Sequence, residues 1–345
     1  MKRQILKYTW FLLWGGAAVW GGLINGYLGI HAACGDCVPP VAVLNHFAHW
    51  VTLAATAVFV FIVPVLVFMK RSRRLKWLMA VWLLPGVIAF GLWYGPAFLP
   101  RPAPDVVGVE FTAATYNVMG FGADAAKTFA VIQDMKADLV ALEELRPVLN
   151  DRLQTELADE YPYQISRVVQ GLDGYALLSR YPILDYHIGL DENSDYRGDT
   201  PRYVRALIDF DGQVVVVYVF HPTIPDLPPR LYFPTAYNDE ILWRQVKGLV
   251  NLIRAEDAPV LVLCDCNSTP RSRQYALLNR YLDEVYGERG WGFGLTFPAD
   301  RPMIRIDYIW HSNDFETLEA KVWLEGGTSD HRPLWASLIL KKDDS

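Results

Sequence analysis

The sequence predicts an α/β sandwich, with helices outside paired sheets, preceded by three membrane-spanning helices. Composition changes near residue 100. Residues 1–100 carry eight Lys or Arg and one acidic residue, which gives a net charge of +7. Residues 101–345 carry 24 Lys or Arg and 37 Asp or Glu, which gives a net charge of −13. Beyond that point, short β-type runs alternate with amphipathic helical patterns. We therefore expect an anchor at 1–100, a Pro-rich linker at 101–108 and a globular domain at 109–340.

Three apolar stretches fill the anchor, at about 8–30, 46–69 and 77–99. Each is close to the roughly 20 residues that an α-helix needs to cross a bilayer. None contains Lys, Arg, Asp or Glu, whose side chains are costly at mid-bilayer. Six glycines in the first stretch favour close helix packing. The sequence therefore predicts a multi-pass protein of the inner or plasma membrane, with the lipid bilayer as its partner.

Basic residues predict the orientation of this anchor. Three of them lie within residues 2–7, before the first stretch, and five more lie within the link at 70–76. Such segments favour the cytoplasmic side, so the globular domain is expected outside the cytoplasm. There, Cys34 and Cys37 can pair or remain thiols. Two alternatives stay open: a cleaved signal peptide, and a re-entrant third stretch around Pro85, which would reverse the orientation.

The globular part contains eight runs rich in Val, Ile, Leu and aromatic residues, which predict strands. They lie at 109–116, 139–142, 176–178, 204–210, 214–220, 260–263, 306–310 and 334–340. Helices are predicted at 125–135, 149–157, 239–255 and 272–279. Asp211-Gly212 is a strong hairpin signal, which excludes a purely parallel sheet. Residues 221–237 contain five prolines, and we expect a long loop that is either functional or disordered.

Polar residues lie at the ends of many predicted strands. They are Asn117, Glu143, Glu144, His221, Asp265, Asn267, Asp307, Asp330 and His331. Each alone is more often a turn former or a structural residue than a catalytic one. Together they would bring several oxygen ligands to one sheet edge, where carboxylate and amide oxygens suit Mg²⁺ or Mn²⁺ rather than zinc. Carboxylates beside histidines can position a metal, activate water and stabilise a phosphoryl transition state.

These residues lie within seven segments that occur in a fixed order. The segments are 117–118, 138–144, 174–180, residue 221, 264–267, 306–308 and 329–333. As a set they resemble the motifs of the endonuclease/exonuclease/phosphatase superfamily, also called DNase-I-like. The segment 292–298 adds a looser resemblance to the bacterial membrane-anchored members of this superfamily. The resemblance covers 109–340. It implies a four-layer αββα sandwich and a metal-dependent hydrolase of phosphoester bonds.

The resemblance also implies the metal ligands. Glu144 is the expected principal ligand of Mg²⁺ or Mn²⁺, with Asn117 and Asp330 near the ion. Glu143 occupies the position of a family glutamine, so it is not assigned as a ligand. Met119 stands where some nuclease members have Asp, so a second metal-associated carboxylate is expected to be missing.

The resemblance assigns catalytic roles to five residues. Asp265 is expected to orient or deprotonate the attacking water, with Asn267 supporting it. His331 is expected to contact phosphate, with Asp307 as the carboxylate that orients the imidazole and favours its charged form. His221 is expected to donate to a phosphate oxygen or to the leaving group.

The segment around Asp265 departs from the family pattern. Cys264 and Cys266 replace the usual Gly and aromatic residue. In a strand they would point away from Asp265, and we expect two small buried packing residues rather than a redox or metal site. Arg305 is expected either to contact phosphate or to form an ion pair.

The substrate class is predicted from charge and from the anchor. A net charge of −13 disfavours a long polyanion such as nucleic acid, whereas tethering raises the local concentration of lipid headgroups. We expect a lipid or other small phosphoester, with an extracytoplasmic endo- or exonuclease as the alternative. A catalytically inactive membrane-bound binding protein would lack a ligand, yet every mapped position is filled. A transporter is disfavoured because the apolar stretches contain no acidic residue, and no protein partner is inferred.

Overall fold

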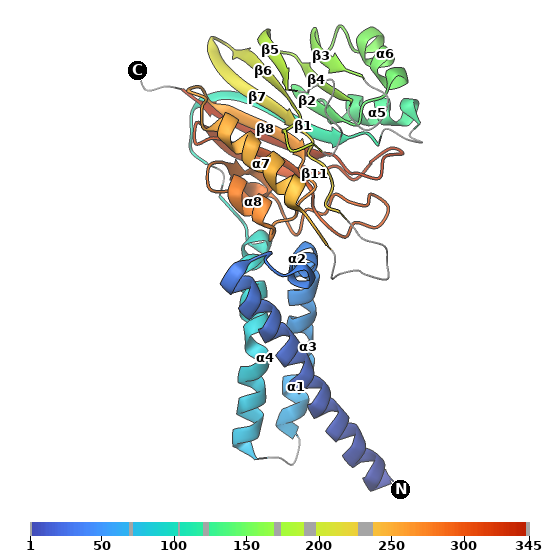
Figure 1. Cartoon of the computed structure of the whole chain (residues 1–345), viewed down its shortest axis with the longest axis vertical. Coiled ribbons are helices and arrows are strands. Elements are labelled where there is room, and N and C mark those ends of the chain that lie inside the picture. Colours follow the sequence, from blue (N-terminus) through green and yellow to red (C-terminus); the bar gives the residue numbers. More distant parts are fainter. Residues whose placement is uncertain are drawn as a thin grey trace. The chain divides into compact units, whose positions relative to one another are not determined.

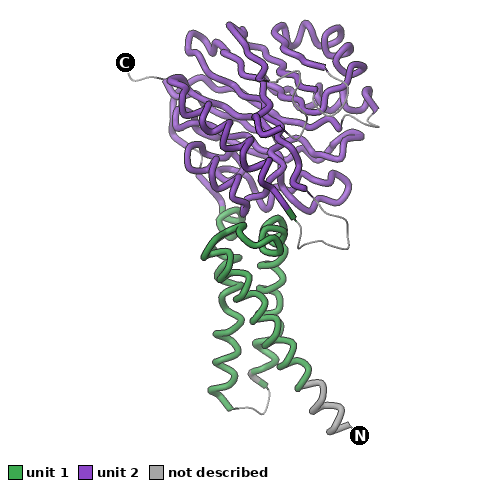
Figure 2. The backbone as a smooth tube through the Cα atoms, viewed as in Figure 1, with its two compact units in different colours: residues 1–99, 229–237 green, residues 100–228, 238–345 purple. Residues whose placement is uncertain are grey.

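The computed structural model describes residues 2–68, 72–102, 104–119, 124–168, 174–189, 198–226 and 237–342. The chain divides into two compact units (Figure 2). The first is built on residues 1–99 and includes Tyr237, and the second is built on residues 100–228 and 238–345. Most of the loop expected at 221–237 lies outside the described residues, as do Lys70 and Arg71 of the basic link.

Three helices of the first unit are long and apolar enough to cross a membrane, as the three apolar stretches of the sequence predicted. The unit comprises α1 (Lys2–Cys34), α2 (Pro39–His46), α3 (Ala48–Phe68), α4 (Arg73–Trp93) and the 3₁₀ helix η1 (Gly95–Phe98). Helix α4 begins four residues before the expected residue 77. Ser72 caps it by accepting a hydrogen bond on Oγ from the backbone N–H of Leu75, at 3.3 Å.

Small residues allow these helices to approach closely. A Cβ on Gly86 of α4 would lie 2.5 Å from the Cβ of Ala55 on α3, and one on Gly21 of α1 would lie 2.4 Å from Trp82. Trp82 also donates from Nε1 to the carbonyl oxygen of Ala18, at 2.9 Å. Only Gly21 and, more loosely, Gly22 of the six glycines in α1 have such a close neighbour. The expected glycine packing is therefore confined to one turn of α1.

The second unit contains two six-stranded mixed sheets (Figure 1). The first has the order β11-β12-β1-β2-β4-β3 and the second the order β5-β6-β7-β8-β10-β9. The strands are β1 (Gly108–Asn117), β2 (Leu139–Glu143), β3 (Tyr163–Arg167), β4 (Tyr175–Ser179), β5 (Ile183–Gly189), β6 (Tyr203–Phe210), β7 (Gln213–Phe220), β8 (Val260–Asp265), β9 (Asp283–Glu284), β10 (Asp307–His311), β11 (Phe315–Val322) and β12 (Leu334–Lys341). Strands β1 and β2 pair in parallel, as do β7 and β8, whereas the other pairs are antiparallel.

Three apolar layers hold the sheets and helices together. One lies between the sheets, where Phe111 of β1 packs against Phe210 of β6. A second joins the first sheet to α5 (Ala125–Met135) and α6 (Pro147–Glu156). A third joins the second sheet to α7 (Glu240–Ile253) and α8 (Arg273–Leu278), which Figure 1 shows lying along it. The expected four-layer αββα sandwich is therefore confirmed.

Four of the twelve strands, β3, β5, β9 and β11, were not predicted from the sequence, nor was the short helix α9 (Val285–Arg289). These four strands are the edges of the two sheets. An edge strand has one neighbour and more solvent contact, so it lacks the continuous apolar run of a central strand. In β5, four consecutive residues are exposed, whereas β8 is buried throughout.

Both cysteine pairs form disulfides, and the described residues contain no free cysteine. Cys34–Cys37 closes the turn after α1, which settles a pairing that the sequence left open. Cys264 and Cys266 are fully buried among apolar residues, as expected. The expectation that they serve only as separate packing residues is wrong, because the two side chains are bonded to each other.

Candidate active site

The candidate site lies where the layer between the two sheets changes from apolar to polar. Alternate residues of a strand point to the same face. The residues Leu139 and Ala141 of β2 therefore lead to Glu143, and Leu261 and Leu263 of β8 lead to Asp265. Asp307 begins β10 directly opposite Asp265, because these two strands are antiparallel. The topology thus brings carboxylates from different strands to one edge.

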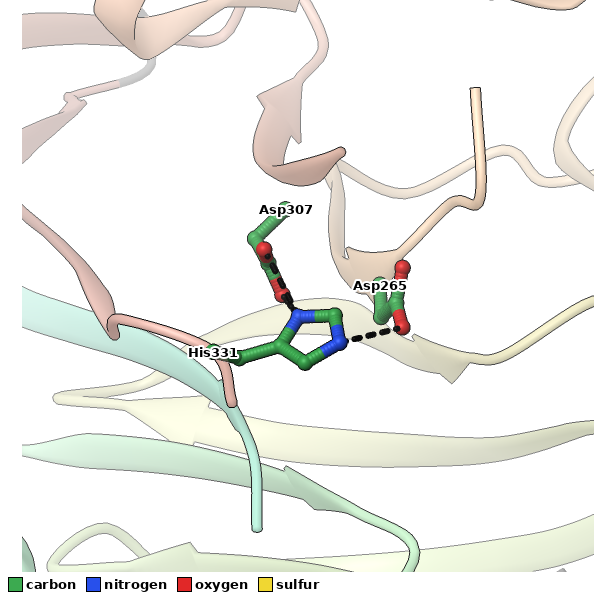
Figure 3. A group of neighbouring side chains, drawn as sticks. All are labelled: Asp265, Asp307 and His331. Atoms are coloured by element: carbon green, nitrogen blue, oxygen red, sulfur yellow. Dashed lines mark hydrogen bonds and ion pairs between the residues drawn. The ribbon is translucent and has the colours of Figure 1, made fainter. Parts of the chain in front are cut away.

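Three buried side chains form the centre of the site: Asp265, Asp307 and His331 (Figure 3). One potential ligand atom from each lies within 4.8 Å of the others. Nδ1 of His331 lies 3.1 Å from both carboxylate oxygens of Asp307, and Nε2 lies 3.7 Å from Oδ2 of Asp265. His331 therefore lies between two carboxylates, one at each ring nitrogen.

Burial and charge act in opposite directions on this imidazole. Burial would lower the pKa of His331, but the charges of Asp307 and Asp265 and the hydrogen bond to Asp307 raise its pKa to about 10. Burial also raises the pKa of Asp265, and the charge of Asp307 adds to this, while His331 opposes it. The pair Asp307–His331 therefore favours the imidazolium at neutral pH, as the sequence reasoning expected of this pair.

Asn117 connects Asp265 to the predicted metal ligand. Its Nδ2 lies 2.9 Å from Oδ2 of Asp265 and 3.1 Å from Oε1 of Glu144, and it donates to both. Nε2 of His221 lies 3.5 Å from the same Asp265 oxygen and 3.9 Å from the same Glu144 oxygen. Four of the predicted residues thus surround one small region between the two sheets.

Backbone conformation turns several of these side chains into place. Among non-glycine residues, Met119, Glu144 and Asn267 have positive φ values of 46°, 58° and 47°. Strict alternation would direct Glu144 away from the layer that holds Glu143. The left-handed turn at Glu144 ends the strand and returns its carboxylate to Asn117. Such conformations cost about 1–3 kcal/mol and are concentrated at functional sites.

The segment that carries Asp330 and His331 is held against β1. Ser329 donates from Oγ to the carbonyl oxygen of Asn117, at 2.7 Å, and Oγ of Ser329 in turn accepts from the backbone N–H of His331, at 3.0 Å. Asp330 is half-buried. Burial is the main cause that raises the pKa of Tyr116, and Asp307 is the main cause that raises that of His331; the charge of Asp330 adds a smaller contribution to both. Asp330 therefore lies at the same edge as the other predicted residues.

The predicted metal ligands and the observed cluster share no residue. The compact His/Asp/Glu group within the described residues contains Asp265, Asp307 and His331, and it includes neither Glu144 nor Asp330. Glu144 instead joins the site through Asn117. Predicted catalytic residues thus form the compact group, while the predicted ligands Glu144 and Asn117 contact each other beside it, at 3.1 Å.

Glu143 is fully buried, whereas its neighbour Glu144 is only half-buried. Oε1 of Glu143 accepts a hydrogen bond from Oγ1 of Thr115, at 2.9 Å. Burial raises its pKa well above the ordinary value, and the charges of Asp265 and Asp307 add to this effect. A neutral acid of this kind resembles an amide in shape and polarity, which agrees with its place at the position of a family glutamine.

Sequence reasoning missed several residues that support the site. Tyr175 donates from its hydroxyl to the carbonyl oxygen of His221, at 3.1 Å, and Nη2 of Arg202 donates to the same oxygen, at 3.3 Å. Thr296 accepts on Oγ1 from the backbone N–H groups of Ile306 and Asp307. Tyr175 belongs to a recognised motif, but no local signal distinguishes Arg202 or Thr296.

Arg305 has a structural role. Its Nη1 lies 2.8 Å from Oε2 of Glu284, and both side chains are buried. The guanidinium also stacks on Tyr286 and Tyr308. Of the two expectations for Arg305, the structure contains the ion pair, and its partner is Glu284. This ion pair holds the backbone in place two positions before Asp307.

The chemistry of these residues fits a divalent cation. Four buried or half-buried carboxylates, from Glu144, Asp265, Asp307 and Asp330, lie at one edge with two imidazoles. Buried carboxylates need a compensating positive charge, and oxygen donors are the ligands that hard cations prefer. The raised pKa of Asp265 follows mainly from its burial, and the charge of the neighbouring Asp307 adds to it.

A four-layer αββα sandwich with carboxylates and histidines at one sheet edge defines the class of DNase-I-like proteins. The sequence profile of the Endonuclease/Exonuclease/phosphatase family matches residues 114–331. The chain belongs to this family. Its members are phosphoester hydrolases that generally depend on divalent metals.

Solved structures share the fold at low sequence identity. The endonuclease/exonuclease/phosphatase from Bacteroides vulgatus is 19% identical with a TM-score of 0.54, over 67% of this chain and 99% of that one. Humanized D. rerio TDP2 is 17% identical with a TM-score of 0.52, over 67% and 99%. The human Nocturnin catalytic domain with bound sulfate is 16% identical with a TM-score of 0.50, over 68% and 96%. A comparison with curated proteins finds no match.

Proposed function

We propose that this protein is a membrane-anchored, divalent-metal-dependent hydrolase of phosphoester bonds. The observation that carries the proposal is the meeting of Asn117, Glu144, Asp265 and the pair Asp307–His331 at one edge of the sandwich. Glu144 and Asn117 would hold Mg²⁺ or Mn²⁺, with Asp330 nearby. When bound, the cation supplies Lewis-acid polarisation of a phosphoryl oxygen.

The remaining residues bind, orient and move protons. Asp265 orients the attacking water and accepts its proton, while the backbone N–H of Asn267 holds Oδ1 of this carboxylate, at 3.1 Å. His331, kept charged by Asp307, donates to a phosphate oxygen. His221 donates to a second phosphate oxygen or to the leaving group. Each role uses a side chain that the strand ends deliver to the same edge.

We propose a lipid or other small phosphoester as the substrate. The net charge of −13 over residues 101–345 opposes binding of a long polyanion. A mostly apolar cavity of about 480 Å³ is lined by Val118 and Met119, which follow Asn117 in the chain, and by residues of α5 and α6, and Arg146 adds a positive charge to its lining. Such a cavity suits a molecule with a phosphoester and an apolar part.

The test is hydrolysis by the full-length protein in detergent micelles. With Mg²⁺ or Mn²⁺ it should cleave bis-(p-nitrophenyl) phosphate, and EDTA should abolish the activity. Glu144→Gln and Asp265→Asn should each lower kcat by about 10²–10³-fold. A panel of phospholipids, inositol phosphates, RNA and plasmid DNA then identifies the substrate. Preference for plasmid DNA would favour the nuclease, and full activity of either variant would reject the assigned roles.

We also propose that the globular domain lies outside the cytoplasm. Eight basic residues flank the predicted spans on the side expected to face the cytoplasm. Both disulfides support this, because such bonds persist in oxidising compartments. A reporter fused after Ser345 that is active only in the cytoplasm would contradict this topology, whereas activity only outside it would support it.

A further inference from the structure

Two bonded cysteines flank the residue that is assigned to activate water. Cys264 and Cys266 form a disulfide across Asp265, and both are fully buried. We propose that this disulfide is a positioning device, which holds the end of β8 so that the Asp265 carboxylate is correctly aimed. The role of Asp265 rests on the proposed function, whereas the effect of the disulfide on the backbone does not.

The backbone is contracted at Asp265, between the two bonded cysteines. Residues two apart in an extended strand have Cα atoms about 6.6 Å apart. The Cα atoms of Cys264 and Cys266 are 5.2 Å apart, a separation within the usual range for bonded cysteines. The contraction falls at the last residue of β8. Immediately after it, the chain turns into the left-handed conformation of Asn267.

This contracted turn supplies the contacts that hold the Asp265 carboxylate. The backbone N–H of Asn267 donates to Oδ1 of Asp265, at 3.1 Å. Asn267 follows Cys266 in the chain, so the cysteine lies between the donor residue and the end of β8. Nδ2 of Asn267 donates to the carbonyl oxygen of Pro222, at 3.1 Å, beside His221. A longer separation between the two cysteines would move this donor away from the carboxylate.

Strand β10 and the residue before it, Ile306, also hold the turn after β8. The backbone N–H of Cys266 donates to the carbonyl oxygen of Ile306, at 2.8 Å, and Asp265 lies opposite Asp307 in the ladder. The two sulfurs lie in the apolar layer with Tyr308, on the face of the sheet away from the site. The disulfide therefore acts through the backbone and touches no reacting atom.

Formation of the bond requires an oxidant. Two S–H bonds break and one S–S bond forms, while two electrons and two protons pass to a disulfide donor of the thiol–disulfide exchange class, which leaves as two thiols. An extracytoplasmic location supplies such donors. Because both cysteines are buried, exchange must precede folding of this strand end or accompany its local opening.

The experiment compares two disulfide-free variants of the full chain. Cys264→Ala/Cys266→Ala removes the proposed device, and Cys34→Ala/Cys37→Ala is the matched control, because it removes the disulfide of the membrane unit. We expect the first to lower kcat by about 10–100-fold while leaving KM and the half-activating Mn²⁺ concentration unchanged. The control should keep the wild-type kcat. Equal kcat values for the two variants would overturn the proposal.

Two further measurements keep the proposal testable if the first variant does not fold or the wild type is inactive. Alkylation and mass spectrometry should find Cys264 and Cys266 bonded in the folded protein, and two free thiols there would overturn the proposal. Hydrogen exchange of peptides covering 261–269 should accelerate on reduction of the folded wild type and recover after reoxidation with oxidised glutathione. Unchanged exchange would overturn the proposal, whereas accelerated exchange in an inactive wild type would reject only the proposed function.

Discussion

His331 and its two carboxylate neighbours form the compact charged group of the candidate site at the residue scale. The imidazole lies between Asp307 at Nδ1 and Asp265 at Nε2, in a site from which water is largely excluded. Both neighbours raise the pKa of His331. Only the family resemblance predicted that Asp307 lies beside His331, because nothing local to its strand indicates that a residue 24 positions later is its neighbour.

Replacement of Asp307 tests this arrangement. In Asp307→Asn the imidazole loses the carboxylate that keeps it charged, so the pKa of His331 falls from its raised value of about 10. We expect kcat to fall by about 10³–10⁴-fold, and the alkaline limb of the kcat–pH profile to move to lower pH. An alkaline limb that stays in place would show that His331 does not act as the charged donor.

Another buried histidine, His311, allows a test of stability away from the site. His311 of β10 lies 2.9 Å from Oε2 of Glu288 on α9 and 3.0 Å from Oγ1 of Thr317 on β11. Burial would lower the pKa of His311, but Glu288 raises it above its ordinary value of 6.5. The ion pair therefore contributes stability that is fully present below about pH 6.5 and is lost as the pH rises through the folded-state pKa.

Glu288→Gln should remove this contribution. At pH 6 we expect a loss of about 1 kcal/mol, because the carboxylate is partly exposed, and the difference from wild type should shrink as the pH rises. Since the pKa of Glu288 is lowered from 4.5, the contribution also disappears as the pH falls through that folded-state pKa. Thermal unfolding of the full chain at pH 6 and pH 9 measures the difference. A constant difference would contradict the ion-pair account.

At the scale of elements, the sequence predicted the central strands and missed the edges. All eight predicted strands are present, because central strands such as β8 are buried on both faces and read as continuous apolar runs. The four missed strands are edge strands with mixed or exposed residues, such as β5. Their pairing depends on contacts with distant segments, which a local pattern does not contain.

The helices of the first unit offer a matched test of element packing. Gly86→Ala in α4 would place a Cβ 2.5 Å from that of Ala55, so α3 and α4 must separate. Gly91 lies on the same helix with nothing within 4 Å of the corresponding position. We expect Gly86→Ala to destabilise the helical unit by about 1–3 kcal/mol, and Gly91→Ala to leave it unchanged or slightly more stable. Thermal unfolding in detergent distinguishes them, and equal effects would contradict close packing at Gly86.

The whole molecule combines an apolar basic unit with an acidic αββα sandwich. The change of composition near residue 100 predicted this division, because bilayer-spanning and globular segments differ in charge and apolar run length. The family motifs singled out the candidate site residues in the sequence. The motifs did not predict the disulfide beside Asp265, because the spacing of two cysteines does not show whether they are separate thiols or a disulfide.

The account depends on several distant carboxylates and imidazoles meeting around one hard cation. Crystals of the full chain grown with Mn²⁺ would locate the ion by its anomalous scattering. We predict one ion in direct contact with Glu144 and beside Asn117, and none at that position in Glu144→Gln. An ion held elsewhere, with the carboxylate of Glu144 making no contact to metal in an active enzyme, would contradict the account.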